Sequence, residues 1–89
     1  SVYTDWEAPQ VSLQNVKLGD GTLTADLSSD EALVKLEVLA DGDLVDVVQV
    51  SSPDAKLSIT NDRISTNATV EVYAYDRYLN CAETRVIGQ

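Results

Sequence analysis

Residues 69–88 read TVEVYAYDRYLNCAETRVIG, and the alternation within this stretch decides the fold class. The first half alternates apolar with polar or aromatic side chains, the apolar set being Val70, Val72 and Ala74. Alternation with a period of two is typical of a strand that buries one face. A polar loop over residues 76–80 follows, and a second alternating segment runs over residues 82–86. The stretch therefore predicts a terminal β-hairpin that closes a sheet.

The same alternation recurs upstream of this hairpin. Five further segments are predicted strands, with turn residues between them: residues 11–18, 22–27, 32–40, a return strand over 44–50 and a short strand around 57–59. The strongest hairpin signal is Asp41-Gly42, between the third and the fourth of these segments. Seven short strands with turns every 8–12 residues or so are the pattern of an immunoglobulin-like sandwich. We therefore expect an all-β fold of seven antiparallel strands in two sheets.

Residues 1–10 precede the first strand and are predicted to be a lead-in or an interdomain linker. Pro9 supports this division, because proline cannot donate a hydrogen bond to a strand ladder. The sandwich is predicted to span residues 11–89. Within its first strand the apolar positions change parity between Leu13 and Val16, which indicates a β-bulge or a change of sheet.

The predicted core follows the alternating positions of the strands. Its members are Val11, Leu13, Leu23, Ala25, Leu27, Val34, Leu36, Val38, Leu57, Ile59, Val70, Val72, Ala74 and Val86. Ile64 lies in the loop before the terminal hairpin and is expected to plug the core from one end.

Length and charge narrow the range of functions. A chain of 89 residues has room for one domain. Its 15 acidic and 6 basic residues give a net charge of −9, which argues against binding to nucleic acid or to an anionic membrane. It has no run of apolar residues long enough for membrane insertion. The absence of histidine, of a nucleophile elbow and of a phosphate-binding loop predicts that this chain is not an enzyme.

Three stretches, taken in order, resemble a known family. They are DWEAPQVSL (residues 5–13), VKLEVLADGDLV (residues 34–45) and VYAYDRYLN (residues 72–80). They are similar to the acidic-x-x-Ala-Pro-x-Val start, the central DG hairpin and the A-x-D-x-x-G-N ending of bacterial immunoglobulin-like and fibronectin type III-like modules. Leu79 departs from the pattern, because the family has glycine there, and the left-handed turn that glycine permits would pass to Asn80.

The resemblance implies a seven-strand, antiparallel immunoglobulin/fibronectin III-like β-sandwich within a larger secreted or cell-surface bacterial protein. Such modules act as spacers or docking domains that position a neighbouring catalytic or adhesive domain. Two alternatives stay open: a carbohydrate-binding accessory module of a secreted hydrolase, and an integral C-terminal domain packed on a hydrolase. Neighbouring domains of the same chain are the expected partners, with a polysaccharide or a cell-surface protein as further candidates. The only cofactor considered is calcium, for which the acidic residues at one end of the predicted sandwich are candidate ligands.

In a sandwich of this topology the lead-in, the second-to-third strand loop and the last hairpin loop meet at one end. These segments carry oxygen-bearing side chains that could hold calcium, which takes six to eight oxygen ligands. The candidate ligands are Asp5, Glu7, Asp30, Asp76 and Asn80, with Glu31 beside them. The alternative is that Asp76 and Asn80 cap their own loop through hydrogen bonds from side chain to backbone.

Tyrosines form the second candidate site. Tyr73 and Tyr75 share the outer face of their strand, and Tyr78 lies at the tip of the following loop. Exposed aromatic side chains can stack on sugars or anchor a protein partner. The alternative is cross-strand packing beneath the long side chains of neighbouring strands.

Overall fold

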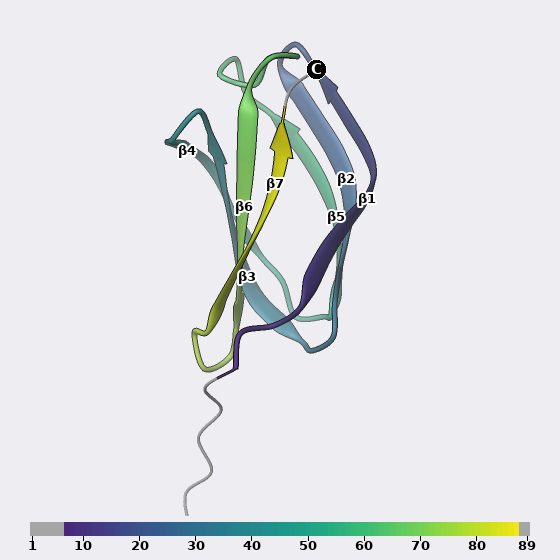
Figure 1. The fold of residues 1–89 in the computed structure, drawn as a ribbon, viewed down its shortest axis with the longest axis vertical. Coiled ribbons are helices and arrows are strands. Elements are labelled where there is room, and N and C mark those ends of the chain that lie inside the picture. The colour runs from purple at the N-terminus through teal and green to yellow at the C-terminus, as the bar shows by residue number, and fades with distance from the viewer. Residues whose placement is uncertain (1–6, 88–89) are drawn as a thin grey trace, which may run out of the picture.

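Residues 7–87 form a sandwich of seven antiparallel strands (Figure 1) in a computed structural model of the chain. The strands are β1 Val11–Gly19, β2 Thr22–Ser29, β3 Leu33–Ala40, β4 Asp43–Gln49, β5 Asp54–Thr60, β6 Thr69–Asp76 and β7 Cys81–Ile87. Residues 7–87 contain no helix that could cross a lipid bilayer. The predicted all-β class and strand number are confirmed.

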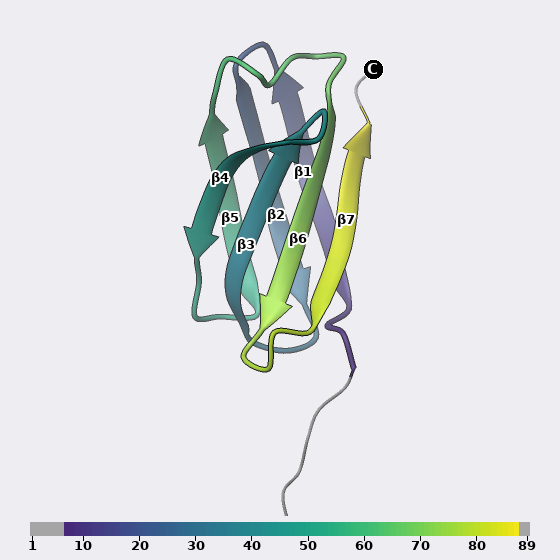
Figure 2. The ribbon, with the colours of Figure 1, turned by 90° about the vertical axis from the view of Figure 1, so that its left-hand side faces the viewer.

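Two sheets face each other across the core (Figure 2). One contains three strands in the order β1-β2-β5, and the other contains four in the order β4-β3-β6-β7. In a constant-type immunoglobulin domain the fourth strand belongs to the first sheet. Here β4 pairs with β3 instead, so the second sheet gains an additional edge strand.

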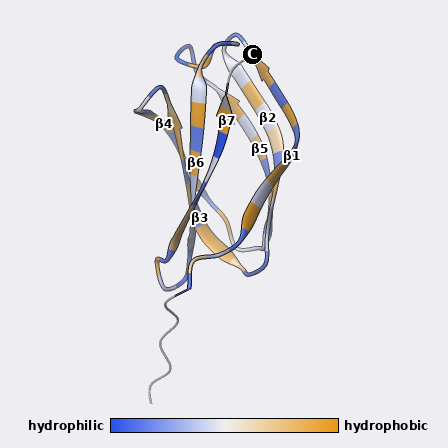
Figure 3. Ribbon diagram, viewed as in Figure 1, coloured by the Kyte–Doolittle hydropathy of each residue, from blue (hydrophilic) through white to orange (hydrophobic). Residues whose placement is uncertain are grey.

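The core lies between the sheets, and in β2, β5 and β6 buried positions alternate with more exposed ones (Figure 3). Ten of the predicted core side chains are buried, namely Leu23, Ala25, Leu27, Leu36, Val38, Leu57, Ile59, Val70, Val72 and Ala74. Val11, Leu13 and Val86 are partly buried and pack against this set. Ile64 is buried as predicted, and its carbonyl accepts a hydrogen bond of 2.6 Å from the Gly21 amide.

The start of β3 corrects one predicted core position. Leu33 is fully buried, whereas Val34 is only half-buried, although Val34 shares the parity of Leu36 and Val38. The cause is a register shift between Leu33 and Lys35 in the pairing of β3 with β6. The irregularity moves the side chains that precede it to the opposite parity.

The predicted bulge in the first strand and the predicted Asp41-Gly42 hairpin turn are both present. In β1 the register with β2 shifts between Gln14 and Lys17, and Asn15 adopts a φ of 54°. At the β3–β4 turn both central residues have positive φ, 49° at Asp41 and 88° at Gly42, as a two-residue type I′ hairpin requires.

The chain enters and leaves the sandwich at opposite ends. β1 and β7 both run upward in Figure 2, so the residues before β1 lie at the lower end and β7 finishes at the upper end. The sandwich is longer along its strands than across its sheets (Figures 1 and 2). The β2–β3 and β6–β7 loops share the lower end with the lead-in (Figures 1 and 2).

Candidate functional site

Hydrogen bonds fasten the lead-in to the lower end of the sandwich. The Gln10 amide donates to Oδ1 of Asp30 at 2.8 Å, and the Asp30 amide donates to the Gln10 carbonyl at 3.1 Å. Pro9 is buried beside them. The segment that sequence analysis treats as a linker is therefore attached to the β2–β3 loop through its last residues.

Asp76 organises the β6–β7 loop. It is the last residue of β6, and only 1% of its surface is exposed. Its Oδ1 accepts hydrogen bonds from the amides of Tyr78 and Asn80, both at 2.9 Å, and its Oδ2 accepts one from Nδ2 of Asn80 at 3.1 Å. The Asp76 carbonyl also accepts from the Leu79 amide at 2.9 Å. These contacts are the loop cap that the sequence offered as an alternative to a metal site.

The same contacts keep Asp76 ionised. Burial alone would raise the pKa of its carboxyl group. A side-chain hydrogen bond with Glu31 and the donors from Asn80 and Tyr78 outweigh burial, so the net pKa lies below its ordinary value. A charged acceptor with short hydrogen bonds makes a strong anchor for a loop.

The structure separates the predicted calcium ligands into different roles. These residues are Asp5, Glu7, Asp30, Asp76 and Asn80. Asp5 lies outside the described residues, and Glu7 is exposed. Asp30 and Asp76 already accept backbone hydrogen bonds. Across residues 7–87 no three acidic or cysteine side chains are grouped so that they could hold a metal ion. Calcium binding stays a prediction without a ligand cluster in this part of the chain.

The tip of the β6–β7 loop, formed by Arg77, Tyr78 and Leu79, is exposed. Tyr78 is 42% exposed and Leu79 is 66% exposed. The Arg77 guanidinium stacks over the Tyr78 ring at 4.9 Å from its centroid and donates to the Tyr78 hydroxyl at 2.7 Å. Leu79 itself adopts the left-handed conformation with a φ of 63°. The expectation that Asn80 would take this conformation is wrong.

Tyr73 and Tyr75 lie on the outer face of the four-stranded sheet, as predicted, and both are half-buried. The Tyr73 hydroxyl donates to Glu71 at 3.0 Å, and the Tyr75 hydroxyl donates to Glu37 at 2.5 Å. The Lys35 ammonium lies over the Tyr75 ring, 4.4 Å from its centroid. These are contacts of cross-strand packing, whereas Tyr78 lies apart from them in the loop.

The glutamates perturb both hydroxyl groups on this face. Hydrogen bonds with Glu83 and Glu71, in that order, raise the pKa of Tyr73 above its ordinary value. The bond with Glu37, followed by burial, raises the pKa of Tyr75. Both tyrosines therefore stay neutral donors to carboxylates, which fixes their rings on the sheet.

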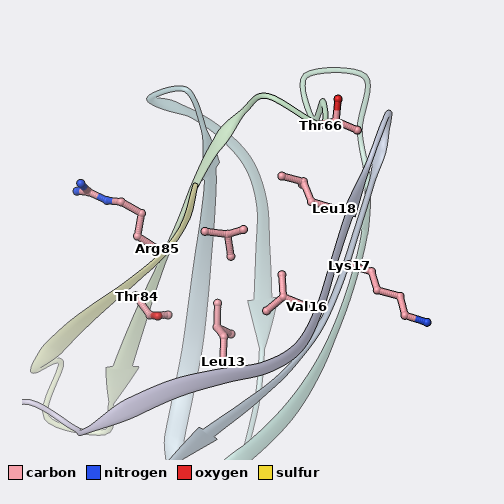
Figure 4. A pocket seen from close by; sticks show the side chains of 8 residues that line it. Leu13, Val16, Lys17, Leu18, Thr66, Thr84 and Arg85 are labelled. Carbon is pink, nitrogen blue, oxygen red and sulfur yellow. The ribbon is translucent and has the colours of Figure 1, made fainter. Parts of the chain in front are cut away.

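A groove that the sequence did not predict lies between β1 and β7. The cavity has a volume of about 720 Å³. Apolar side chains point into it, whereas the charged ends of Lys17 and Arg85 point away (Figure 4). The apolar lining comes from Leu13, Val16, Leu18 and Val86. The change of parity in the first strand was its signal, because the bulge leaves Val16 38% exposed.

In comparisons with known proteins, no family model, no curated protein and no solved structure matches the chain. The function is therefore inferred from the architecture and from the side chains at the lower end of the sandwich.

Proposed function

We propose that the chain is a non-catalytic structural module of a larger secreted or surface bacterial protein, in which it positions a neighbouring catalytic or adhesive domain. The observation that supports this proposal most directly is the placement of the two ends. The chain enters the sandwich at one end of its long axis and leaves at the other (Figure 2). Modules built in this way join end to end, so each adds its length to the separation of its neighbours.

The strand directions suit a module under tension. β1 pairs only with β2, and β7 pairs only with β6, in antiparallel ladders. Hydrogen bonds in such ladders lie perpendicular to the strands. Force applied along the long axis therefore shears each ladder and loads its hydrogen bonds together. The hydrogen bonds between Gln10 and Asp30 support the same role, because they attach the residue before β1 to the β2–β3 loop.

The proposal is tested by single-molecule pulling in two geometries. The first attaches the handles at the two chain ends. The second attaches them at the N-terminus and at the exposed Cys81, which begins β7 at the lower end. The second geometry peels strands from one end and loads their hydrogen bonds one after another. We expect a clearly higher unfolding force in the first geometry. Equal forces would remove the mechanical support for a spacer.

The carbohydrate-binding alternative rests on the adjacency of Tyr73 and Tyr75 on an open sheet face. Lys35 would have to leave the Tyr75 ring before a sugar could stack there. Pull-down on a panel of insoluble polysaccharides, with Tyr75→Ala as the variant, decides this alternative. Binding that is lost in the variant would favour it, and a lack of binding to every polysaccharide would reject it.

A further inference from the structure

Leu79 carries backbone strain that packing within residues 7–87 does not offset. Three non-glycine residues of the described chain have positive φ, namely Asn15, Asp41 and Leu79. Asparagine and aspartate tolerate this conformation. Here the Asn15 side chain also donates a hydrogen bond to Asp26, and the Asp41 side chain accepts one from the Thr69 amide. Leucine has neither advantage.

The loop prevents Leu79 from relaxing. Asp76 accepts hydrogen bonds from the amides of Tyr78, Leu79 and Asn80, so the backbone on both sides of Leu79 is fixed. Glycine would adopt the same backbone without strain. The leucine side chain is 66% exposed, so packing inside the module does not offset the strain. Strain of this kind is concentrated at functional positions.

The side chains beside Leu79 have the chemistry of a protein contact. Tyr78 is 42% exposed and has Arg77 stacked on its ring. Within the described residues Arg77 forms no ion pair with a carboxylate, although the chain has a net charge of −9. Tyrosine and arginine are enriched among the residues that dominate binding energy at interfaces. The tip therefore fits a protein surface with an apolar depression beside a carboxylate.

We propose that the tip formed by Arg77, Tyr78 and Leu79 docks on the domain that precedes this module in its own chain; this inference rests on the proposed function. The position of the tip identifies that occupant. The tip lies at the end of the sandwich where the chain enters (Figures 1 and 2), and Gln10 is hydrogen-bonded to the β2–β3 loop at the same end. A domain attached through the lead-in would follow on the end of the sandwich where the tip lies.

A contact of three side chains is sufficient for a tethered partner. A short linker converts docking into an intramolecular event with an effective concentration on the order of millimolar. A weak interface then stays closed most of the time, particularly when one partner is rigid before docking. The Asp76 hydrogen bonds provide that rigidity.

The test uses the parent chain with its natural upstream domain. Leu79→Gly removes the side chain and the strain together, and Leu44→Ser is the matched control because Leu44 is a 56% exposed leucine in β4. The measurements are the rate of limited proteolysis at the junction before Pro9 and the thermal midpoint of the sandwich. Amide chemical shifts of Tyr78 and Leu79, with and without the upstream domain, report direct contact.

We expect cleavage about tenfold faster in Leu79→Gly, the effect of truncating one important interface residue, with no fall in the thermal midpoint. Leu44→Ser should cleave at the wild-type rate. The docking inference would be overturned if the upstream domain held a fixed orientation while the amide chemical shifts of Tyr78 and Leu79 did not change with its presence and Leu79→Gly was cleaved at the wild-type rate. That result would leave the spacer role standing. A parent chain with no domain upstream would remove both.

Discussion

Replacing Asp76 with alanine should destabilise the fold strongly, because its carboxylate holds the β6–β7 loop. Asp76 is 1% exposed, and its carboxylate accepts hydrogen bonds from two backbone amides and from the Asn80 side chain, beside its side-chain hydrogen bond with Glu31. Each hydrogen bond to a charged group contributes about 1.5–3 kcal/mol net. The loop is at the surface, so water can replace part of this contribution after the change. We therefore expect a loss of about 3 kcal/mol.

That loss is large for a chain of this length. At roughly 0.05–0.15 kcal/mol per residue, a domain this small has a total stability on the order of 4–13 kcal/mol. A loss of about 3 kcal/mol corresponds to a fall of about 12–24 °C in the thermal midpoint. Asp76→Asn keeps one oxygen acceptor but loses the charge, so its loss should be about 1–2 kcal/mol. Asp62→Ala removes an exposed acidic residue from the loop before β6 and should change stability by less than about 0.5 kcal/mol.

Urea unfolding followed by far-UV circular dichroism measures all three variants under the same conditions. The free energy of unfolding should decrease from wild type to Asp76→Asn to Asp76→Ala, and that of Asp62→Ala should lie close to wild type. If Asp76→Ala lies within about 0.5 kcal/mol of wild type, its hydrogen bonds do not hold the loop. If the two Asp76 variants are equally unstable, the charge and not the hydrogen-bond geometry is what stabilises this end.

Three further predictions follow from the same contacts. Because the folded-state pKa of Asp76 is lowered from 3.8, its stabilisation should be fully present above the unfolded-state pKa and be lost as pH falls through the folded-state value. The pKa values of Asp26 and Glu83 are lowered as well, so urea midpoints from pH about 5 to about 2 should fall in both proteins, and further in wild type than in Asp76→Asn. Leu33→Ala should cost about 2–5 kcal/mol and Val34→Ala less than about 1.5, and equal losses in urea unfolding would contradict the register shift at the start of β3. The predicted calcium site requires a calcium-specific rise of about 10–20 °C in the thermal midpoint, measured against chelator with magnesium as the control; no rise would leave Asp30 and Asp76 as hydrogen-bond acceptors of their loops.

Most strand positions could be predicted because most of the strands alternate by themselves. Residues 22–27 and 70–74 bury every second side chain, and this pattern needs no knowledge of the partner strand. The Asp41-Gly42 turn was equally local, since two consecutive positive φ angles favour that pair. The bulge in β1 was visible as a change of parity, although the groove that it opens beside β7 depends on packing between sheets.

The errors have a different physical origin. Leu33 is buried instead of Val34 because of how β3 meets β6, and the residue that pairs with Leu33 there is Asp76. Leu79 is left-handed because hydrogen bonds to Asp76 fix the loop around it, although leucine disfavours that conformation by about 1–2 kcal/mol. In both cases a long-range or loop constraint overrides local preference.

Both departures from local rules therefore meet at Asp76. The strands of the body follow patterning and turn chemistry at nearly every position, which is the consistency expected where a sequence has only to fold. At the lower end a buried carboxylate fixes a bulged strand on one side and a strained leucine on the other. A glycine would close this loop with less strain, so stability of the isolated sandwich does not account for Leu79. The exposed side chain that the strained backbone presents is the feature for which a contact outside the sandwich supplies a reason.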